Sequence, residues 1–478
     1  MQRVHAGENS LSKNPDATVN LPLVSAIVGV ATIGGFMFGY DSGVINGTQE
    51  GLRSTFNLSE AWLGVTVSAL LPGCALGAFL AGRSADLWGR RRVMVAAAVL
   101  FIVSALAAGA AASALMMIAA RFAAGVGVGA ASVLSPAYIS EVTPASMRGR
   151  LSSMQQVMII AGLTGAFFAN YFLADFAGKS TDPLWLGFAA WRWMFWMQVF
   201  PASVFFLTLL FIPESPRYLV ARGRHDDAKA VLTRLFGSAT AASKAQEIRG
   251  SLAADHAPRL SDLIDKSTKK LRPIVWVGIG LASLQQLVGI NVVFYYGAVL
   301  WQAVGFSEAD SLKINILSGT LSIAACLVAI FLIDRIGRKP LLLIGSIGMA
   351  ATLGVLTVAF ATGDMINNTL HLAPTVGLTA LISANLYVIF FNLSWGPVMW
   401  VMLGEMFPNQ IRGSGLAVSG AVQWTTNFLI SVSFPVLAKD VGLPITYGLY
   451  TACAFGSILF VVKMVHETRG RELEAMVG

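Results

Sequence analysis

The heptapeptide "DLWGRRR", Asp86 to Arg92, has a near copy in the second half of the chain, "DRIGRK", Asp334 to Lys339. Two further motif pairs keep the same order. In the first, an acidic residue stands seven positions before Arg-Gly, as Glu141 before Arg148 and Glu405 before Arg412. In the second, an acidic residue is closely followed by arginine, in "PESPR" (Pro213 to Arg217) and in "HETRG" (His466 to Gly470). Three motif pairs in matching order indicate a chain built from two similar halves.

The composition indicates that both halves lie in a membrane. The 478 residues are 55% hydrophobic and 12% charged, with a mean hydropathy of +0.68, whereas soluble domains carry about 25% charged residues. A transmembrane helix needs about 20 mostly apolar residues. Twelve such segments are predicted, at 21–45, 61–81, 93–112, 113–137, 153–173, 191–212, 273–304, 312–333, 340–361, 374–403, 413–437 and 446–465. The predicted fold class is an all-α membrane protein with twelve transmembrane helices in two six-helix halves.

The positive charges predict the orientation. With the N-terminus in the cytoplasm, the inner loops hold about 27 of the 33 lysines and arginines, as the positive-inside rule requires. We expect both termini to be cytoplasmic, the plasma (inner) membrane to be the location, and no cleaved signal peptide, because the first twenty residues lack a basic segment leading into an apolar core. The net charge of +8 then faces anionic lipid, and a nucleic-acid partner is excluded.

The expected organisation has five parts. These are a cytoplasmic tail at 1–20, a six-helix half at 21–212, a partly helical cytoplasmic linker at 213–272, a second six-helix half at 273–465 and a cytoplasmic tail at 466–478. Duplicated bundles of this kind place the substrate site between the halves, near the membrane midplane.

Charged residues recur at the inner helix ends of both halves. The set is Arg83, Arg90, Glu141, Arg148, Glu214, Arg335, Arg338, Glu405, Arg412 and Glu467. Positive-inside anchoring alone is one interpretation. The other is a cytoplasmic latch, in which ion pairs between helix ends hold the inner side shut while the outer side is open. Exposed pairs contribute only about 0 to 1 kcal/mol each, but a network can bias a two-state element.

Two charged residues lie inside apolar segments, Asp41 in "GGFMFGYDSGVIN" and Arg121 in "AARFAAGVGVG". A charge deep in a membrane costs at least about 2.5 kcal/mol, so each needs a partner, water or neutralisation. Helical rise places Asp41 about 8 Å and Arg121 about 12 Å from the outer end of their helices. We therefore predict an ion pair between them. It is either a fixed structural lock or a proton switch in which protonation of Asp41 releases Arg121.

Neutral polar residues and aromatic side chains gather mainly in the second half. "LQQLVGINVVFYYG" contains Gln285, Gln286, Asn291 and Tyr295, with Gly289 as a predicted helix break. Other segments add Trp395, Gln423 and Trp424, and the first half adds Gln156. Amides both donate to and accept from hydroxyl groups, and an aromatic face covers the apolar side of a sugar ring. This set therefore predicts an uncharged polyol substrate, although interhelical amide contacts are the alternative explanation.

The motifs together resemble the sugar porter family of the major facilitator superfamily. "GRSADLWGRRR", "PESPRYL", "QQLVGINVVFYY", "SWGPVMWVMLGEMFPNQIRG" and "ETRGR" carry the resemblance over nearly the whole chain. Within this family, the sequence is similar to bacterial sugar/proton symporters, such as those for xylose, and to facilitative glucose transporters.

The resemblance implies a site for each ligand. Sugar binding falls to Gln156, Gln285, Gln286, Asn291, Trp395, Gln423 and Trp424, with Phe38 and Tyr295 nearby. Proton-coupled members carry an acid at the position of Asp41, where passive members carry asparagine. Ser322 falls where many members have a sugar-binding asparagine, and His466 replaces a proline.

The leading hypothesis is proton-coupled symport of a monosaccharide, a hexose such as glucose or else xylose, by alternating access. The expected partners are the sugar, the proton and the lipid bilayer, and the chain is expected to act as a monomer without a cofactor. A uniporter with a structural Asp41–Arg121 pair and a transporter-like sugar receptor are the alternatives. No nucleophile–base set, metal cluster or phosphate loop suggests an enzyme.

Overall fold

The computed structural model describes residues 19–144, 147–254, 260–265, 269–366, 369–408 and 410–469. The helices before the linker are α1 (Leu21–Phe56), α2 (Glu60–Ser68), α3 (Leu70–Trp88), α4 (Arg90–Gly109), α5 (Ala114–Val142), α6 (Arg148–Ala177), a 3-10 turn (Trp185–Gly187), α7 (Ala190–Met197) and α8 (Val199–Leu209). The linker forms α9 (Pro216–Ala221), α10 (His225–Phe236), α11 (Ser238–Ala254) and a 3-10 turn (Leu260–Leu263).

The second half has matching elements. They are α12 (Pro273–Leu287), α13 (Ile290–Ala303), α14 (Glu308–Ile336), α15 (Arg338–Ala361), α16 (Pro374–Leu393), α17 (Trp395–Met406), α18 (Arg412–Val436), a π-helical turn (Leu437–Val441) and α19 (Leu443–Met464). A short antiparallel hairpin, β1 (Asp364–Ile366) and β2 (Thr369–His371), is the one departure from the all-α prediction within the described residues.

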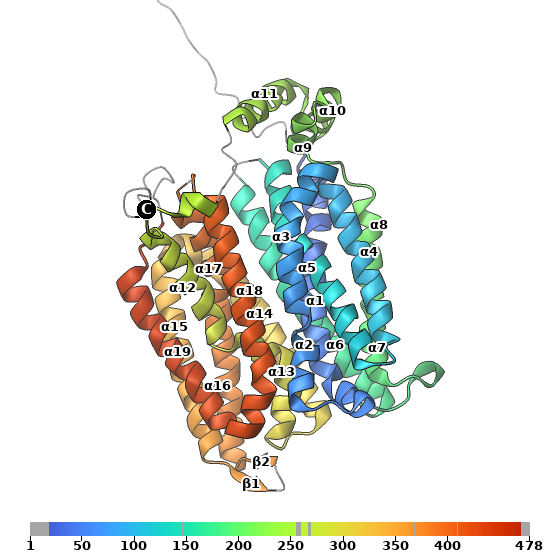
Figure 1. The fold of residues 1–478 in the computed structure, drawn as a ribbon, viewed down its shortest axis with the longest axis vertical. Helices are drawn as coiled ribbons and strands as arrows, with labels where there is room; N and C mark the ends of the chain where they lie inside the picture. The colour runs from blue at the N-terminus through green and yellow to red at the C-terminus, as the bar shows by residue number, and fades with distance from the viewer. Residues whose placement is uncertain are drawn as a thin grey trace, which may run out of the picture.

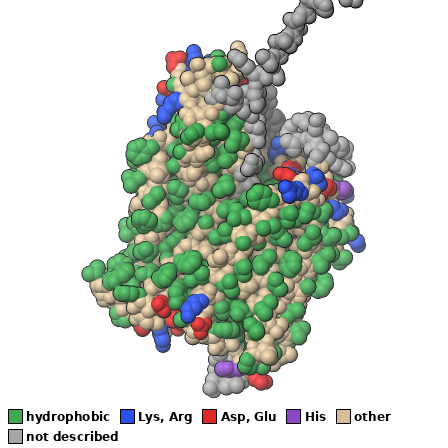
Figure 2. Space-filling model, turned by 180° about the vertical axis from the view of Figure 1, so that it is seen from behind, with side chains coloured by type: hydrophobic (Ala, Val, Ile, Leu, Met, Phe, Trp, Pro, Cys, Tyr) green, Lys and Arg blue, Asp and Glu red, His purple; other side chains and the backbone are tan. Residues whose placement is uncertain are grey.

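Figure 1 shows two helix bundles side by side, with α9, α10 and α11 at one end and the β1–β2 hairpin at the other. We call these ends the linker side and the far side. Figure 2 shows hydrophobic side chains over most of one face, with charged groups gathered toward the ends. Ten of the described helices or helix pairs are long and apolar enough to cross a membrane. The other two predicted segments are helical as well, as α7 with α8 and as α18.

Four of the predicted segments contain a break, and two breaks lie in the middle of the second half. Gly289 has a positive φ of +80° between α12 and α13, as predicted, and a β-carbon there would clash with the Tyr450 ring at 2.6 Å. Ser394, whose φ of −134° and ψ of −87° are not helical, separates α16 from α17. Broken helices expose backbone groups for binding, which is tolerated in membranes where they face a cavity or protein.

The first helix is longer than predicted. The prediction ended it at residue 45 because the next residues are polar, but α1 continues to Phe56. Asn46 and Gln49 are both 1% exposed, because they bind the other half of the molecule instead of solvent.

Glycines permit close packing within the first half. A β-carbon on Gly39 would lie 1.7 Å from the Ile159 carbonyl oxygen of α6, and Gly43 faces Leu163 of the same helix. In "GVGVG", Gly125 and Gly129 lie against backbone carbonyls of α3. Small residues allow helix backbones to approach closely in this way.

Candidate functional site

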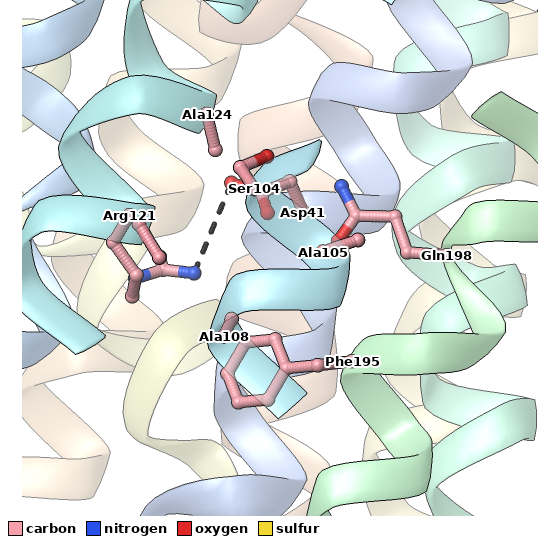
Figure 3. Close-up of a pocket in the computed structure, with 9 residues that line it drawn as sticks. Asp41, Ser104, Ala105, Ala108, Arg121, Ala124, Phe195 and Gln198 are labelled. Atoms are coloured by element: carbon pink, nitrogen blue, oxygen red, sulfur yellow. Dashed lines mark ion pairs between the residues drawn. The ribbon is translucent and has the colours of Figure 1, made fainter. Parts of the chain in front are cut away.

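Asp41 and Arg121 meet at the core of the first half, as predicted. Arg121 Nη1 lies 3.8 Å from Asp41 Oδ2, and both side chains are 4% exposed or less. Figure 3 shows the two side chains approaching from α1 and α5 across a narrow pocket that Ser104, Phe195 and Gln198 also line. The matching depths arise because both helices rise by the same amount per residue.

The ion pair is incompletely satisfied. Arg121 Nη2 donates to the Val67 carbonyl oxygen at 3.4 Å, but Nε and Nη1 of Arg121 and Oδ2 of Asp41 have no hydrogen-bond partner. Gln198, 1% exposed, turns its side chain into the same pocket, and its Nε2 is also without a partner. Buried polar groups without partners are costly, so these unpartnered atoms distinguish the site from a fully hydrogen-bonded ion pair.

Gln198 was not predicted as a site residue. It lies at the break between α7 and α8, in an aromatic segment whose composition is typical of packing at a membrane interface. Only its place beside Asp41 in three dimensions reveals its relevance.

The predicted amides of the second half form one connected cluster. Gln285 Nε2 donates to the Trp395 carbonyl oxygen at 3.0 Å, and Gln286 and Gln423 both donate to Gln285 Oε1 at 3.1 Å. Asn291 Nδ2 donates to Gln286 Oε1 at 2.6 Å. The helix breaks bring α12, α13, α17 and α18 together here, which is why residues far apart in sequence share one network.

The predicted aromatic residues take different positions. Trp395 is 0% exposed, and its Nε1 donates to the Leu342 carbonyl oxygen and the Ser346 hydroxyl, so its N–H group is already engaged within the second half. Trp424 instead faces Phe38 of the first half, with ring centroids 5.7 Å apart. This aromatic contact bridges the halves near the middle of α1 and α18.

The remaining predicted sugar residues lie at the margins of this cluster. Tyr295 is buried, with 4% of its surface exposed, and its carbonyl oxygen accepts a hydrogen bond from Gln49 Nε2 of the first half. Gln156 is partly buried on α6, and no hydrogen bond joins it to the amide cluster. The structure therefore joins the second-half amides in one hydrogen-bond network, to which Gln156 makes no hydrogen bond.

A second polar chain links α14 and α16, and only one of its members, Ser322, was singled out from the sequence. Asn392 Nδ2 donates to Ser322 Oγ at 3.2 Å, Ser322 Oγ donates to the Ser318 carbonyl oxygen, and Ser318 Oγ donates to Asn385 Oδ1. All four side chains are at most 7% exposed. The sequence signal that could have indicated this polar chain is the pair Asn385 and Asn392, which lie two turns apart on one apolar helix.

The halves are joined toward the far side. Asn46 Nδ2 donates to the Phe294 carbonyl oxygen at 2.7 Å, and Asn46 Oδ1 accepts from Ala298 N at 3.1 Å and from Asn315 Nδ2 at 2.8 Å. The Ser180 backbone N–H donates to Glu308 Oε1 at 3.0 Å. Over the part of the chain that the structure describes, all the hydrogen bonds between the halves lie on this side of the Phe38–Trp424 contact.

The predicted latch residues pair within each half. Arg90 lies 3.3 Å from Glu141, and Arg338 lies 2.8 Å from Glu405. Glu214 accepts from the Arg91 backbone N–H, as Glu467 does from those of Arg338 and Lys339. Ser215 donates to Glu141, as Thr468 does to Glu405. We call these two matching arrangements the first clamp and the second clamp.

The motif glycines complete each clamp. Gly89 and Gly337 have φ of +99° and +103°, and the carboxylates of Glu214 and Glu467 occupy the space where a β-carbon would lie. Arg83 and Arg335 are exposed and make no ion pair with any described residue, Arg412 Nε donates to the Phe407 carbonyl oxygen, and the Arg148 side chain lies outside the described set. The described latch residues thus brace each half internally.

A family model described as "Sugar (and other) transporter" matches residues 27–477. The chain belongs to this sugar transporter family. The glucose transport protein of Synechocystis sp. is 48% identical, over 98% of this chain and 100% of its own length. The D-xylose-proton symporter of Escherichia coli K12 is 37% identical, over 96% of each chain.

Solved structures agree with the family. A partially occluded inward-open structure of the E. coli xylose transporter XylE matches with a TM-score of 0.81 and 35% identity, over 94% of this chain and 100% of that one. XylE bound to 6-bromo-6-deoxy-D-glucose matches with a TM-score of 0.78, over 96% and 99%. The sugar transporter described here is therefore a multi-pass membrane protein of the major facilitator fold, as predicted, and a transporter rather than an enzyme.

Proposed function

We propose that this sugar transporter is a proton-coupled symporter of a monosaccharide, with Asp41 as the proton carrier and Arg121 as its partner. The observation that carries the proposal is the buried, incompletely satisfied Asp41–Arg121 pair. A permanent structural ion pair normally has short contacts and full hydrogen bonding, because desolvation is otherwise not offset. A 3.8 Å pair with vacant donors instead suits a carboxyl group that changes its protonation state.

The transport cycle follows from the arrangement of the halves. A proton on Asp41 neutralises the carboxylate and frees Arg121, while the sugar binds the amide cluster between the halves. The halves then rock about this site, and both ligands are released on the other side. A membrane potential contributes about 2.3 kcal/mol per charge per 100 mV, which is roughly fiftyfold accumulation for one proton.

The substrate proposal places glucose first and xylose second. The relative with 48% identity is a glucose transport protein, and the relative with 37% identity is a xylose-proton symporter. Neutral amides and aromatic rings at the cluster support an uncharged sugar of either kind. We further propose a plasma-membrane location with both termini and the linker in the cytoplasm, and a functional monomer, because one chain supplies both halves of the site.

Facilitated uniport is the second candidate. It is favoured by one observation: Arg121 already donates to the Val67 carbonyl oxygen, which a purely structural role of the pair would also produce. A sugar receptor that moves little substrate is a weaker third candidate.

The experiment uses the purified full chain in tight liposomes with a pH-sensitive dye inside. Glucose, xylose, galactose and fructose are added in turn to the wild type and to Asp41→Asn. We expect one sugar to acidify the lumen in the wild type only, while Asp41→Asn still exchanges that labelled sugar across the membrane.

Labelled sugar entry without proton movement in the wild type would establish uniport and a structural Asp41. Tight binding with no net sugar entry would favour the receptor.

A further inference from the structure

We infer that the segment between α6 and α7, residues 178–189, is a membrane anchor whose apolar tip inserts into the far-side leaflet of the bilayer. We call it the anchor hairpin. Its partner is the boundary between lipid headgroups and acyl chains. The inference uses the membrane location of the chain and none of the residues of the proposed transport site.

The anchor hairpin projects sideways from the first bundle. Figure 1 shows the segment between α6 and α7 leaving the bundle near its far side, and Figure 2 shows hydrophobic side chains on this projection, at the left edge of that view. Backbone hydrogen bonds hold its shape. Leu184 N–H donates to the Phe188 carbonyl oxygen at 2.8 Å, and Trp191 N–H donates to the Ser180 carbonyl oxygen at 2.9 Å. The tip is therefore held out by a regular scaffold.

The side chains at the tip are unsuited to contact with water. Trp185, Leu186 and Phe188 are 48%, 85% and 44% exposed, and Leu186 is the most exposed large hydrophobic residue among those that the structure describes. The tip sequence "LWLGF", residues 184–188, carries no charge, whereas Lys179 and Asp182 lie at the base of the hairpin. A contiguous apolar patch rimmed by polar residues marks an interaction site.

The backbone at Leu186 adds an independent argument. Its φ of 58° and ψ of 17° lie in the left-handed region, which glycine and asparagine adopt more readily than leucine. The folded protein gains little from this particular side chain, because 85% of its surface touches no other part of the protein. Insertion into lipid would explain why the tip carries leucine at a position that disfavours it.

The tip continues a surface that already faces lipid. Phe168, Phe172 and Phe176 are four residues apart on one face of α6, within the apolar segment Met154–Ala177, and are 40%, 61% and 72% exposed. In a membrane this face contacts acyl chains. The Phe176 ring lies 6.0 Å from the Trp185 ring, measured between centroids. The hairpin therefore extends the lipid-facing stripe of α6.

The hairpin also folds back beside the membrane helices. The Phe188 ring lies 5.2 Å from the Trp196 ring between centroids. Trp196 comes six residues after the start of α7, which is about 9 Å along the helix. Its Nε1 donates to the Leu106 carbonyl oxygen of α4 at 3.2 Å. Tryptophans of this kind are enriched where a membrane meets water, so the tip lies at that depth.

The first experiment measures immersion of the tip. The full chain with Cys453→Ala keeps only the buried Cys74 and Cys326, and Leu186→Cys then carries an environment-sensitive fluorophore in liposomes. The matched control is Asn57→Cys, because Asn57 is also exposed, lies in the first half and has a positive φ of 54°. We expect lipids brominated on their acyl chains to quench the label at position 186 and iodide in the water to quench the label at position 57.

Two further variants test which side chains cause the immersion. Adding Trp185→Ser and Phe188→Ser to the labelled protein should remove most of the quenching by brominated lipid, because each ring contributes apolar area to the inserted surface. Leu186→Asn suits the left-handed backbone. It should keep or raise the thermal midpoint in detergent and lower it in liposomes, whereas a purely structural tip would shift both midpoints alike.

Three results would overturn the inference. The first is iodide reaching the label at position 186 as readily as the label at position 57. The second is a label shielded from both quenchers, together with cross-linking of two Leu186→Cys chains, which would show that the tip docks on a second copy. The third is equal shifts of both midpoints in Leu186→Asn. Size-exclusion profiles establish that each variant is folded.

Discussion

Asp41 and Arg121 form a buried ion pair whose two charges are expected to depend on each other. Each ion is buried, and each has polar atoms without partners. Removing one member of a buried pair typically costs about 3–5 kcal/mol, because the other charge is left without compensation, whereas replacing both by neutral groups is often tolerated. The stability of single and double variants therefore measures how strongly the two charges depend on each other.

We predict that Arg121→Met lowers the thermal midpoint in detergent more than the double variant Asp41→Asn/Arg121→Met. The single change leaves a buried carboxylate alone, and the second change removes it. Tryptophan fluorescence follows unfolding, since the chain has 11 tryptophans. As a control, Arg53→Met breaks a partly exposed pair with Glu60 and should cost less than about 1 kcal/mol. Additive effects of the two buried changes would contradict the interdependence.

Glu467 gives a prediction that depends on pH. Burial raises the pKa of Glu467. Hydrogen bonds from the backbone N–H groups of Arg469, Arg338, Lys339 and Thr468 together lower this pKa by more than burial raises it, so the pKa lies below its usual value. A lowered pKa means that the ionised carboxylate stabilises the folded state above the unfolded pKa of about 4.3, and that this stabilisation is lost as the pH falls below it.

We predict that Glu467→Gln destabilises the protein at pH 7 by about 1 kcal/mol, because solvent screens this partly exposed carboxylate and glutamine keeps one accepting oxygen. Thermal scans of both proteins between pH 7 and pH 3 should show the difference narrowing only below about pH 4.3. A difference that stays constant down to pH 3 would mean that the charge contributes nothing.

At the scale of elements, α1 combines tasks that most helices keep separate. Its glycine face packs on the α6 backbone, its middle carries Asp41, and its last turns bind the other half through Asn46 and Gln49. Because these features lie on one continuous helix, a change at Asp41 and a change at the contact between the halves are expected to move the same rigid element.

We predict that Gly39→Ala severely reduces folded protein, because its β-carbon would lie 1.7 Å from a backbone oxygen that cannot move without shifting α6. Gly29→Ala on the same helix has nothing within 4 Å of the new carbon and should be neutral or slightly stabilising. Size-exclusion profiles and yields of the two variants provide the measurement. Equal, wild-type behaviour of both would show that α1 and α6 are not packed as described.

At the scale of the whole molecule, duplication extends to single atoms. The first clamp joins Arg90, Glu141, Glu214 and Ser215, and the second joins Arg338, Glu405, Glu467 and Thr468 in the same pattern. Each clamp ties helices of its own half, so each half can move as one body. Over the described residues, the hydrogen bonds that join the two halves lie at the far side.

We predict that Asn46→Ala shifts the protein toward opening on the far side. The Asn46 side chain donates one hydrogen bond and accepts two, and all three join the halves. At about 0.5–1.5 kcal/mol each, their loss changes the population ratio about tenfold or more. Spin labels at the exposed positions Asn57 and Lys439, with Cys453 replaced, report the separation of the halves. Labels that stay at the wild-type distance would show that Asn46 does not hold this side shut.

Much of this arrangement was predictable, for a definable reason. Hydropathy and motif duplication predicted the helices, and constant helical rise placed Asp41 and Arg121 at one depth. Depth alone does not give rotation about a helix axis, so the sequence did not reveal that Asn392 faces Ser322 or that Gln198 faces Asp41. It also could not show that the inner ion pairs lie within the halves, because matched motifs fit pairing within or between halves equally well.

The two clamps also differ in one respect, which is the time at which each can form during synthesis. All residues of the first clamp lie at or before Ser215 in the chain, so this clamp can form while the second half is still being synthesised. The second clamp can form only after Glu467 and Thr468 have been synthesised. Because domains generally fold from the N-terminus as the chain emerges, the first half is expected to reach its braced form early. A chain stopped after Val465 should then yield a protease-resistant first half beside a cleavable second half, so the ribosome itself would set the order of assembly.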